Sequence, residues 1–137
     1  DQKKSIDIRF LDHVAIRVKD LTISADWYQK VLGLKKNQAP EWGDSILLLV
    51  GKSGIALFPA DTTYKQLDAT SKNVKIDHFA FNVSKDNFEK AKKRYTELNL
   101  DFAVRDHHYF HSIYTKDPDG HIVELTTIVV DENKFYR

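Results

Sequence analysis

The sequence contains no cysteine and no methionine, and its charges nearly cancel. Without cysteine the chain can form no disulfide, no thiolate metal site and no cysteine nucleophile. It has 21 basic and 20 acidic residues, a net charge of +1, so it lacks the basic footprint of a nucleic-acid-binding protein. No apolar run approaches the roughly 18 residues that span a bilayer, and no secretory signal is visible. We therefore expect no nucleic-acid partner, no membrane partner and a cytoplasmic location.

The residues that are present fit one compact domain. The length of 137 residues suits a single domain, and 42% apolar with 30% charged residues is ordinary for a soluble globular protein. We expect one domain over residues 1–137. The chain begins at Asp1 without a methionine, so trimming upstream of it stays open.

A seven-residue motif occurs twice and divides the chain into two similar halves. Residues 12–18 read Asp-His-Val-Ala-Ile-Arg-Val, and residues 77–83 read Asp-His-Phe-Ala-Phe-Asn-Val, an offset of 65 with four of seven positions identical. Internal repeats of this kind indicate a structural unit that is used more than once.

Each copy of the motif predicts a strand with one apolar and one polar face, because side chains alternate along a strand. The polar faces would carry His13, Ala15 and Arg17 in the first copy and His78, Ala80 and Asn82 in the second. A buried structural face seldom has this composition, so we expect the floor of a partly hydrated pocket. Asp12 and Asp77 are expected to point away from their histidine neighbours and not to ligate the same metal.

Helical and strand patterns follow each motif in the same order. The first helix is predicted over 22–32 with Gly33 ending it, and the second over 85–98 with Ser84 as its N-cap and Asn99 in the place of Gly33. Strands are predicted over 8–18, 45–50 and 55–58, and then over 75–83, 101–105, 109–116 and 122–130. Residues 34–40 are expected to form a short connector or a strand.

The element order predicts an α+β fold built from two tandem βαβββ modules. The first module covers about 8–59 and the second about 74–128, with a polar linker at about 60–73. One such unit cannot cover both faces of its sheet, so we expect the two to form a curved mixed sheet around a cleft, with the helices on its outer side.

Glu124 is a candidate third ligand for a metal ion, beside the two motif histidines. Glu124 stands in a β-rich run, and the repeat aligns it with Ala56 of the first half. If His13 and His78 floor the cleft and Glu124 joins them, two imidazoles and one carboxylate can bind a divalent ion and leave positions open for substrate or water. We predict these three residues as ligands of one ion, with Fe, Mn, Ni, Co and Zn as candidates.

The chain resembles the vicinal oxygen chelate superfamily, which includes glyoxalase I, bleomycin-resistance proteins, fosfomycin-resistance enzymes and extradiol ring-cleaving dioxygenases. Residues 11–16, 27–34, 77–81 and 114–124 carry the resemblance. It implies paired βαβββ modules and a metal held by the first-strand histidines and the last-strand glutamate. It also implies a small substrate chelated through vicinal oxygens and a homodimer, often with ligands from two chains in one site.

Residues at a few positions distinguish the different reactions of the superfamily. Glyoxalase I enzymes usually have a fourth ligand where this chain has Ala56, which argues against their reaction. Fosfomycin transferases have a serine and a tyrosine where Ser112 and Tyr114 stand, but their lysine and second serine would fall at Val104 and His108. Their arginine beyond the glutamate would fall near Asn133.

The extradiol dioxygenase signature fits the segment from Tyr114 to Glu124, with His107 at a workable distance as acid or base. That family's acid/base histidine lies between the two ligand histidines, and this chain has none between His13 and His78. We favour a dioxygenase-like metalloenzyme slightly. The alternatives are a fosfomycin-type transferase, a glyoxalase-like lyase or isomerase, a ligand-sequestering protein of the bleomycin-resistance type and a degenerate paralogue with a structural role.

The remaining site predictions divide into two groups. Tyr114, His107 and His108 are candidate catalytic residues. Arg17, Asn82 and Ser112 are candidate substrate contacts.

Overall fold

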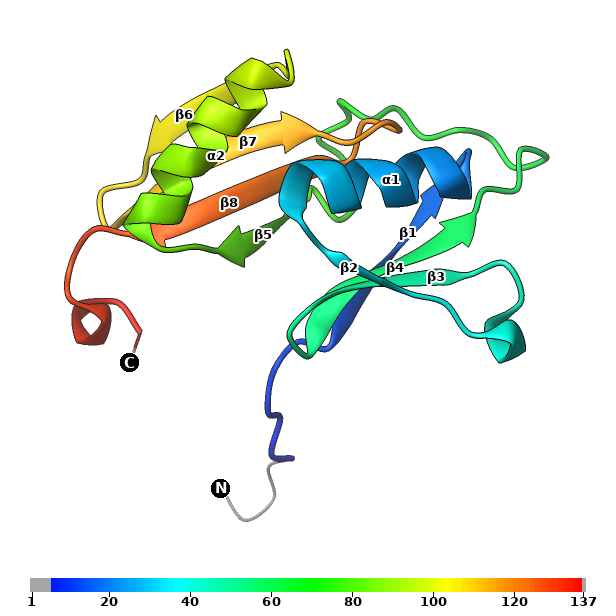
Figure 1. Cartoon of the computed structure of the whole chain (residues 1–137), viewed down its shortest axis with the longest axis horizontal. Coiled ribbons are helices and arrows are strands. Elements are labelled where there is room, and N and C mark those ends of the chain that lie inside the picture. Colours follow the sequence, from blue (N-terminus) through cyan, green and yellow to red (C-terminus); the bar gives the residue numbers. More distant parts are fainter. Residues whose placement is uncertain (1–5, 137) are drawn as a thin grey trace. The chain divides into compact units, whose positions relative to one another are not determined.

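The computed structural model describes residues 6–136, which form two compact units (Figure 1). One unit ends at Asp61 and the other begins at Thr62, so the boundary falls within the segment 60–73. Each unit has the order strand, helix, three strands, which confirms the predicted α+β fold with a duplicated βαβββ module. No helix in residues 6–136 is both long and apolar enough to cross a membrane.

The first unit is a four-stranded sheet with one helix. Its elements are β1 (His13–Val18), α1 (Leu21–Leu32), β2 (Lys35–Asn37), the short 3-10 helix η2 (Pro40–Trp42), β3 (Ile46–Val50) and β4 (Ser53–Pro59). The strand order is β1-β4-β3-β2, and only the β1–β4 pair is parallel. A parallel pair needs a long crossover, which α1 and the next two strands supply.

The second unit repeats this topology. Its elements are β5 (His78–Asn82), α2 (Lys85–Glu97), β6 (Phe102–Asp106), β7 (Phe110–Lys116), β8 (Ile122–Ile128) and the short 3-10 helix η3 (Glu132–Lys134). The strand order is β5-β8-β7-β6, with β5 and β8 parallel.

Strand register supports the alignment of the two halves. Ala15 of β1 pairs with Ala56 of β4, and Ala80 of β5 pairs with Glu124 of β8. Ala15 and Ala80 are equivalent positions of the repeated motif, so Glu124 stands where the first unit has Ala56. This outcome matches the alignment made from the sequence.

The helix ends follow the predicted caps. Gly33 adopts a left-handed conformation with φ 70°, and its N–H donates to the Gln29 carbonyl at 3.0 Å. Asn99 takes the same region with φ 55°. The Ser84 hydroxyl accepts from the Asn87 N–H at 3.2 Å, which satisfies one of the free donors at the start of α2.

The predicted alternation of the repeated motif is confirmed, but the strand starts were placed too early. Ile16 and Val18 are buried, while His13 and Arg17 on the other face are exposed. The strand predicted over 8–18 begins only at His13, because its parallel partner pairs from Gly54 onwards. An alternating pattern extends a strand only where a neighbouring backbone is present to accept and donate hydrogen bonds.

The strand predicted over 75–83 is also shorter at its start. It begins at His78, because its register with β8 opens at Ile122. Both strands therefore start at the histidine of the motif, and the preceding aspartate lies outside the strand.

A buried tyrosine in α2 gives the first stability prediction. Tyr95 is 1% exposed, and its hydroxyl has no hydrogen-bond partner among residues 6–136. An unpaired buried hydroxyl costs about 1–3 kcal/mol. We expect Tyr95→Phe to raise the free energy of unfolding by about 1 kcal/mol at pH 7 in urea titrations, with the exposed Tyr64→Phe as an unchanged control.

The same substitution should alter the alkaline limb of the stability profile. Burial raises the pKa of Tyr95, so the folded chain keeps this proton after the unfolded chain has released it. Stability therefore falls as pH rises above about 10, by up to about 1.4 kcal/mol per pH unit. Tyr95→Phe should lose this component; equal alkaline slopes in wild type and variant would contradict it.

Candidate metal centre

A buried carboxylate lies at the middle of the second sheet. Glu124 is 4% exposed and sits in β8 between Ala80 of β5 and Tyr114 of β7. Its Oε2 accepts a hydrogen bond from the Ser112 hydroxyl at 2.6 Å, and its Oε1 lies 3.0 Å from Nε2 of His78. A buried carboxylate needs such partners, because an unpaired one is strongly disfavoured.

The imidazole of His78 stands between two carboxylates. Its Nε2 faces Glu124, and its Nδ1 lies 2.8 Å from Oδ2 of Asp77. The hydrogen bond from His78 is the main reason that the pKa of Asp77 is held below its usual range. His13 repeats the second contact, with its Nδ1 2.7 Å from Oδ2 of Asp12.

These contacts correct the expectation that Asp12 and Asp77 point away from their histidine neighbours. Strand alternation does not apply to them, because β1 begins at His13 and β5 at His78. A residue just before a strand can turn its short side chain onto the first strand residue. The prediction was wrong because it extended strand geometry beyond the first residue of each strand.

The His78 and Glu124 atoms fit a shared cation. With Nδ1 donating to Asp77, a neutral His78 would turn a lone pair at Nε2 towards the Glu124 carboxylate, so a proton or a metal ion must lie between them. Metal–donor bonds of about 2.0–2.2 Å place two neighbouring donors about 3.0 Å apart at the right angle of an octahedral ion and about 3.4 Å apart at the tetrahedral angle. The observed separation is 3.0 Å.

The third predicted ligand belongs to the other unit. His13 lies on the exposed face of β1, and its Asp12 partner leaves Nε2 as the free ring nitrogen. Within residues 6–136 no three His, Cys, Asp or Glu side chains form a ready-made metal site. The second unit therefore supplies two of the three predicted donors.

A tyrosine and a histidine stand beside the carboxylate. Tyr114 pairs with Glu124 across β7 and β8, and its hydroxyl shares a 2.8 Å hydrogen bond with Nε2 of His107. Burial, the charge of Glu124 and hydrogen bonding with Glu124 raise the pKa of Tyr114. The hydroxyl therefore stays protonated at neutral pH and can act as a donor.

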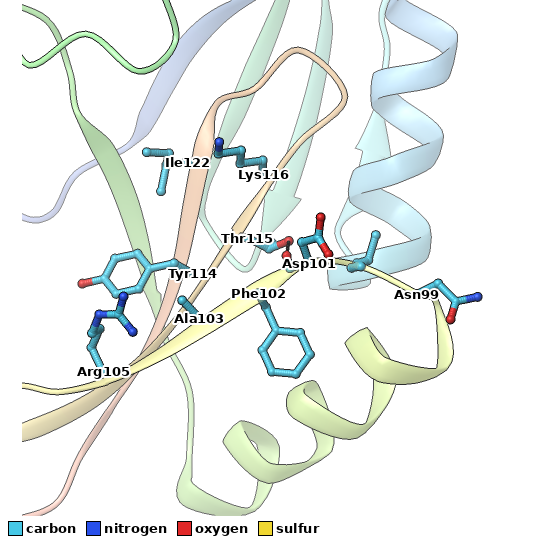
Figure 2. Close-up of a pocket in the computed structure, with 10 residues that line it drawn as sticks. Asn99, Asp101, Phe102, Ala103, Arg105, Tyr114, Thr115, Lys116 and Ile122 are labelled. Carbon is cyan, nitrogen blue, oxygen red and sulfur yellow. Dashed lines mark hydrogen bonds between the residues drawn. The ribbon is translucent and has the colours of Figure 1, made fainter.

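A pocket of about 690 Å³ opens next to Tyr114 (Figure 2). Its lining comes from the segment after α2 and from β6, β7 and the start of β8: Asn99, Leu100, Asp101, Phe102, Ala103, Arg105, Tyr114, Thr115, Lys116 and Ile122. Figure 2 shows the Arg105 side chain beside Tyr114. The pocket thus has two cations, Arg105 and Lys116. It shares Tyr114 with the group of side chains around Glu124, here called the carboxylate cluster: Glu124, His78, Ser112, Tyr114 and His107.

Arg105 and Lys116 are not among the site residues predicted from the sequence. Strand alternation could have found both, since Arg105 pairs with Ser112, and Lys116 lies two residues after Tyr114 on the same strand. Both cations could therefore be predicted as neighbours of Ser112 and Tyr114, which are themselves predicted site residues.

Two further predicted site residues, Arg17 and Asn82, lie one on each unit. In the first unit the Arg17 guanidinium donates to the Pro59 carbonyl at 3.1 Å and lies over the Phe58 ring. Asn82 is exposed at the end of β5, opposite Thr126.

His107 and His108 separate in the structure although they are neighbours in sequence. His107 contacts Tyr114, whereas the His108 ring packs edge-on against Tyr109 with centroids 4.7 Å apart. His108 has φ 72°, and its N–H donates to Asp106. Of the two candidate histidines, only His107 is seen next to the tyrosine of the cluster.

Comparison with known proteins gives consistent matches. The family described as the Glyoxalase/Bleomycin resistance protein/Dioxygenase superfamily matches residues 10–125. The metallothiol transferase FosB of Lysinibacillus sphaericus (strain C3-41) is 28% identical over 138 residues, covering 94% of this chain and 89% of that protein.

Solved structures match over most of the chain. A glyoxalase/dioxygenase from Nostoc punctiforme has a TM-score of 0.76 at 20% identity, covering 93% of this chain and 99% of that one. The fosfomycin resistance protein FosX from Mesorhizobium loti has a TM-score of 0.66 at 25% identity, covering 93% and 99%.

Proposed function

The chain belongs to the glyoxalase/bleomycin resistance protein/dioxygenase superfamily, and from this premise we propose that it is a metal-dependent enzyme acting on a small substrate bound through vicinal oxygens. His13, His78 and Glu124 would hold one divalent ion. The observation that carries the proposal is the 3.0 Å approach of His78 Nε2 to the buried Glu124 carboxylate. Two imidazoles and one carboxylate leave coordination positions open for a substrate.

The ion and the residues around it would have different roles in the reaction. A bound ion would polarise substrate oxygens and stabilise negative charge as it develops. Ser112 holds one carboxylate oxygen of Glu124 and so fixes the direction of the other. The protonated Tyr114 hydroxyl would donate to a substrate oxygen, and His107, hydrogen-bonded to it, would supply or accept the proton.

A dioxygenase-like reaction remains the first candidate. The support is the position of His107, which contacts Tyr114 although it follows both motif histidines in the sequence. The extradiol signature has a histidine upstream of its Ile-Tyr pair, and His107 lies at a workable distance before Ile113 and Tyr114. In this proposal the substrate is a small molecule with adjacent hydroxyl groups and the second substrate is dioxygen.

A fosfomycin-type transferase is the second candidate, and the relatives favour it. A metallothiol transferase is 28% identical to this chain, and a fosfomycin resistance protein of known structure is 25% identical. Val104 and His108 stand where the transferase pattern has a lysine and a serine, but Arg105 places a cation beside Tyr114 in the pocket. A phosphonate could be bound by such a cation.

A substrate panel separates these proposals. Protein loaded with Fe²⁺, Mn²⁺, Co²⁺, Ni²⁺ or Zn²⁺ would be assayed with catechols under oxygen and with fosfomycin plus thiols. We expect turnover in one arm, and loss of that turnover when the metal is removed by a chelator. Stoichiometric ligand binding without turnover in every arm would instead indicate a sequestering protein.

Tyr114 gives a prediction for whichever substrate of the panel is turned over. We expect Tyr114→Phe to lower turnover about 100-fold, because it removes the proton donor, while metal affinity changes less than about threefold. The matched control is Tyr109→Phe, whose ring packs against Phe135 rather than in the cluster. Unchanged turnover in Tyr114→Phe would exclude this hydroxyl from the chemistry.

A further inference from the structure

Both copies of the repeated motif place a carboxylate against the same atom of the histidine that follows it. The Asp12 Oδ2 to His13 Nδ1 distance is 2.7 Å, and the Asp77 Oδ2 to His78 Nδ1 distance is 2.8 Å. The two contacts arise in different units, from different surroundings. Their recurrence indicates a property of the motif rather than of one local environment.

The contact decides which ring nitrogen is free. An imidazole that donates from Nδ1 to a carboxylate presents the lone pair of its Nε2 to any other partner. In His78 the free Nε2 is the atom that faces Glu124 at 3.0 Å. The aspartate therefore selects both the tautomer and the ring direction that the proposed ion needs.

We infer that Asp12 and Asp77 are positioning residues for His13 and His78, which they hold with Nε2 turned towards the divalent ion. This inference rests on the proposed function. Neither aspartate would touch the ion, because each acts through the far side of the ring. Both are exposed, with 73% and 63% of their side-chain surface accessible, so neither is needed for core packing.

The test compares alanine with asparagine at each position. Asp77→Ala removes both the charge and the acceptor oxygen, whereas Asp77→Asn removes the charge and keeps an acceptor. We expect Zn²⁺ affinity, measured by calorimetry, to fall about 10- to 100-fold in Asp77→Ala and less in Asp77→Asn. Asp12→Ala and Asp12→Asn should follow the same order. Asp86→Ala, an exposed aspartate in the first turn of α2, is the matched control.

A second readout does not depend on metal. Nitrogen-15 NMR of the metal-free protein should show the neutral ring of His13 protonated at Nδ1 in wild type and Asp12→Asn, with this preference lost in Asp12→Ala. If Asp12→Ala keeps both the wild-type tautomer of His13 and the wild-type Zn²⁺ affinity, the positioning role is overturned while the metal site stands. Equal losses of Zn²⁺ affinity in the alanine and asparagine variants would mean that the aspartate acts only through its charge. That result would also overturn the positioning role.

Failure of the proposed function would look different. Wild-type protein that binds no Zn²⁺ overturns the metal site and the role of the aspartates towards it, whatever the NMR result. Wild-type binding together with a loss in His78→Ala, but none in Asp77→Ala, overturns the positioning role alone.

Discussion

Glu124→Gln is expected to reduce the affinity for a divalent ion at least about 100-fold. Loss of an outer partner of a metal ligand costs about 10- to 100-fold, and loss of a charged ligand should cost no less. The glutamine can still accept the hydrogen bond from Ser112, so the fold should survive the change. Calorimetric titration with Zn²⁺ and with Mn²⁺ measures the effect, and circular dichroism checks the fold.

The matched control is Glu132→Gln, which makes the same charge change at an exposed position in η3. We expect its affinity to stay within about threefold of wild type, since a distant surface charge is screened by salt. Equal affinities in the two variants would remove Glu124 from the ligand set.

The same variants can show whether a homodimer shares its sites. If one chain contributes His13 and the other His78 and Glu124, then mixing His13→Ala with Glu124→Gln subunits restores one intact site per mixed dimer. If all three ligands come from one chain, the mixture binds no better than either variant alone. The resemblance to the superfamily implies the shared arrangement, so we expect restoration of binding in the mixture.

Gly54→Ala is expected to destabilise the first unit by about 3 kcal/mol. A Cβ at Gly54 would collide with the carbonyl oxygen of Leu48 and lie 3.1 Å from its carbonyl carbon, and neither belongs to a flexible side chain. Overpacking of this kind costs about 1–3 kcal/mol, and a backbone obstacle places it at the upper end. Because Gly54 pairs with His13, a shift of β4 should also weaken metal binding.

Gly51→Ala separates this steric effect from backbone strain. Gly51 has φ 57°, but apart from its two chain neighbours no atom of the described residues lies within 4 Å of a Cβ placed there. Left-handed strain alone should cost about 1–2 kcal/mol. Urea unfolding in which Gly54→Ala is no less stable than Gly51→Ala would contradict the close approach of β3 and β4.

Most of the fold could be predicted from the seven-residue motif that occurs at residues 12–18 and 77–83. Its alternation predicted which face of β1 is buried and which face of β5 is half-buried. Its alignment placed Glu124 opposite Ala80, as Ala56 stands opposite Ala15. These features follow from local periodicity and from the equivalence of the halves. Gly33 was also predictable, because a glycine after a helical pattern satisfies the left-handed C-cap.

Features that depend on partners distant in sequence were not predictable in the same way. The start of β1 at His13 depends on where β4 begins, which the apolar pattern of residues 8–12 does not contain. The contact of Asp77 with His78 depends in turn on β5 starting at the histidine. The separation of His107 from His108 depends on the loop between β6 and β7, where His108 takes a positive φ.

The most direct test of the account is a crystal structure of the metal-loaded protein, with the ion located by anomalous scattering. The account predicts one ion with Nε2 of His13, Nε2 of His78 and a carboxylate oxygen of Glu124 each at about 2.0–2.2 Å, from one chain or from two. An ion bound elsewhere, or one with Glu124 outside coordination distance in every subunit, would contradict it.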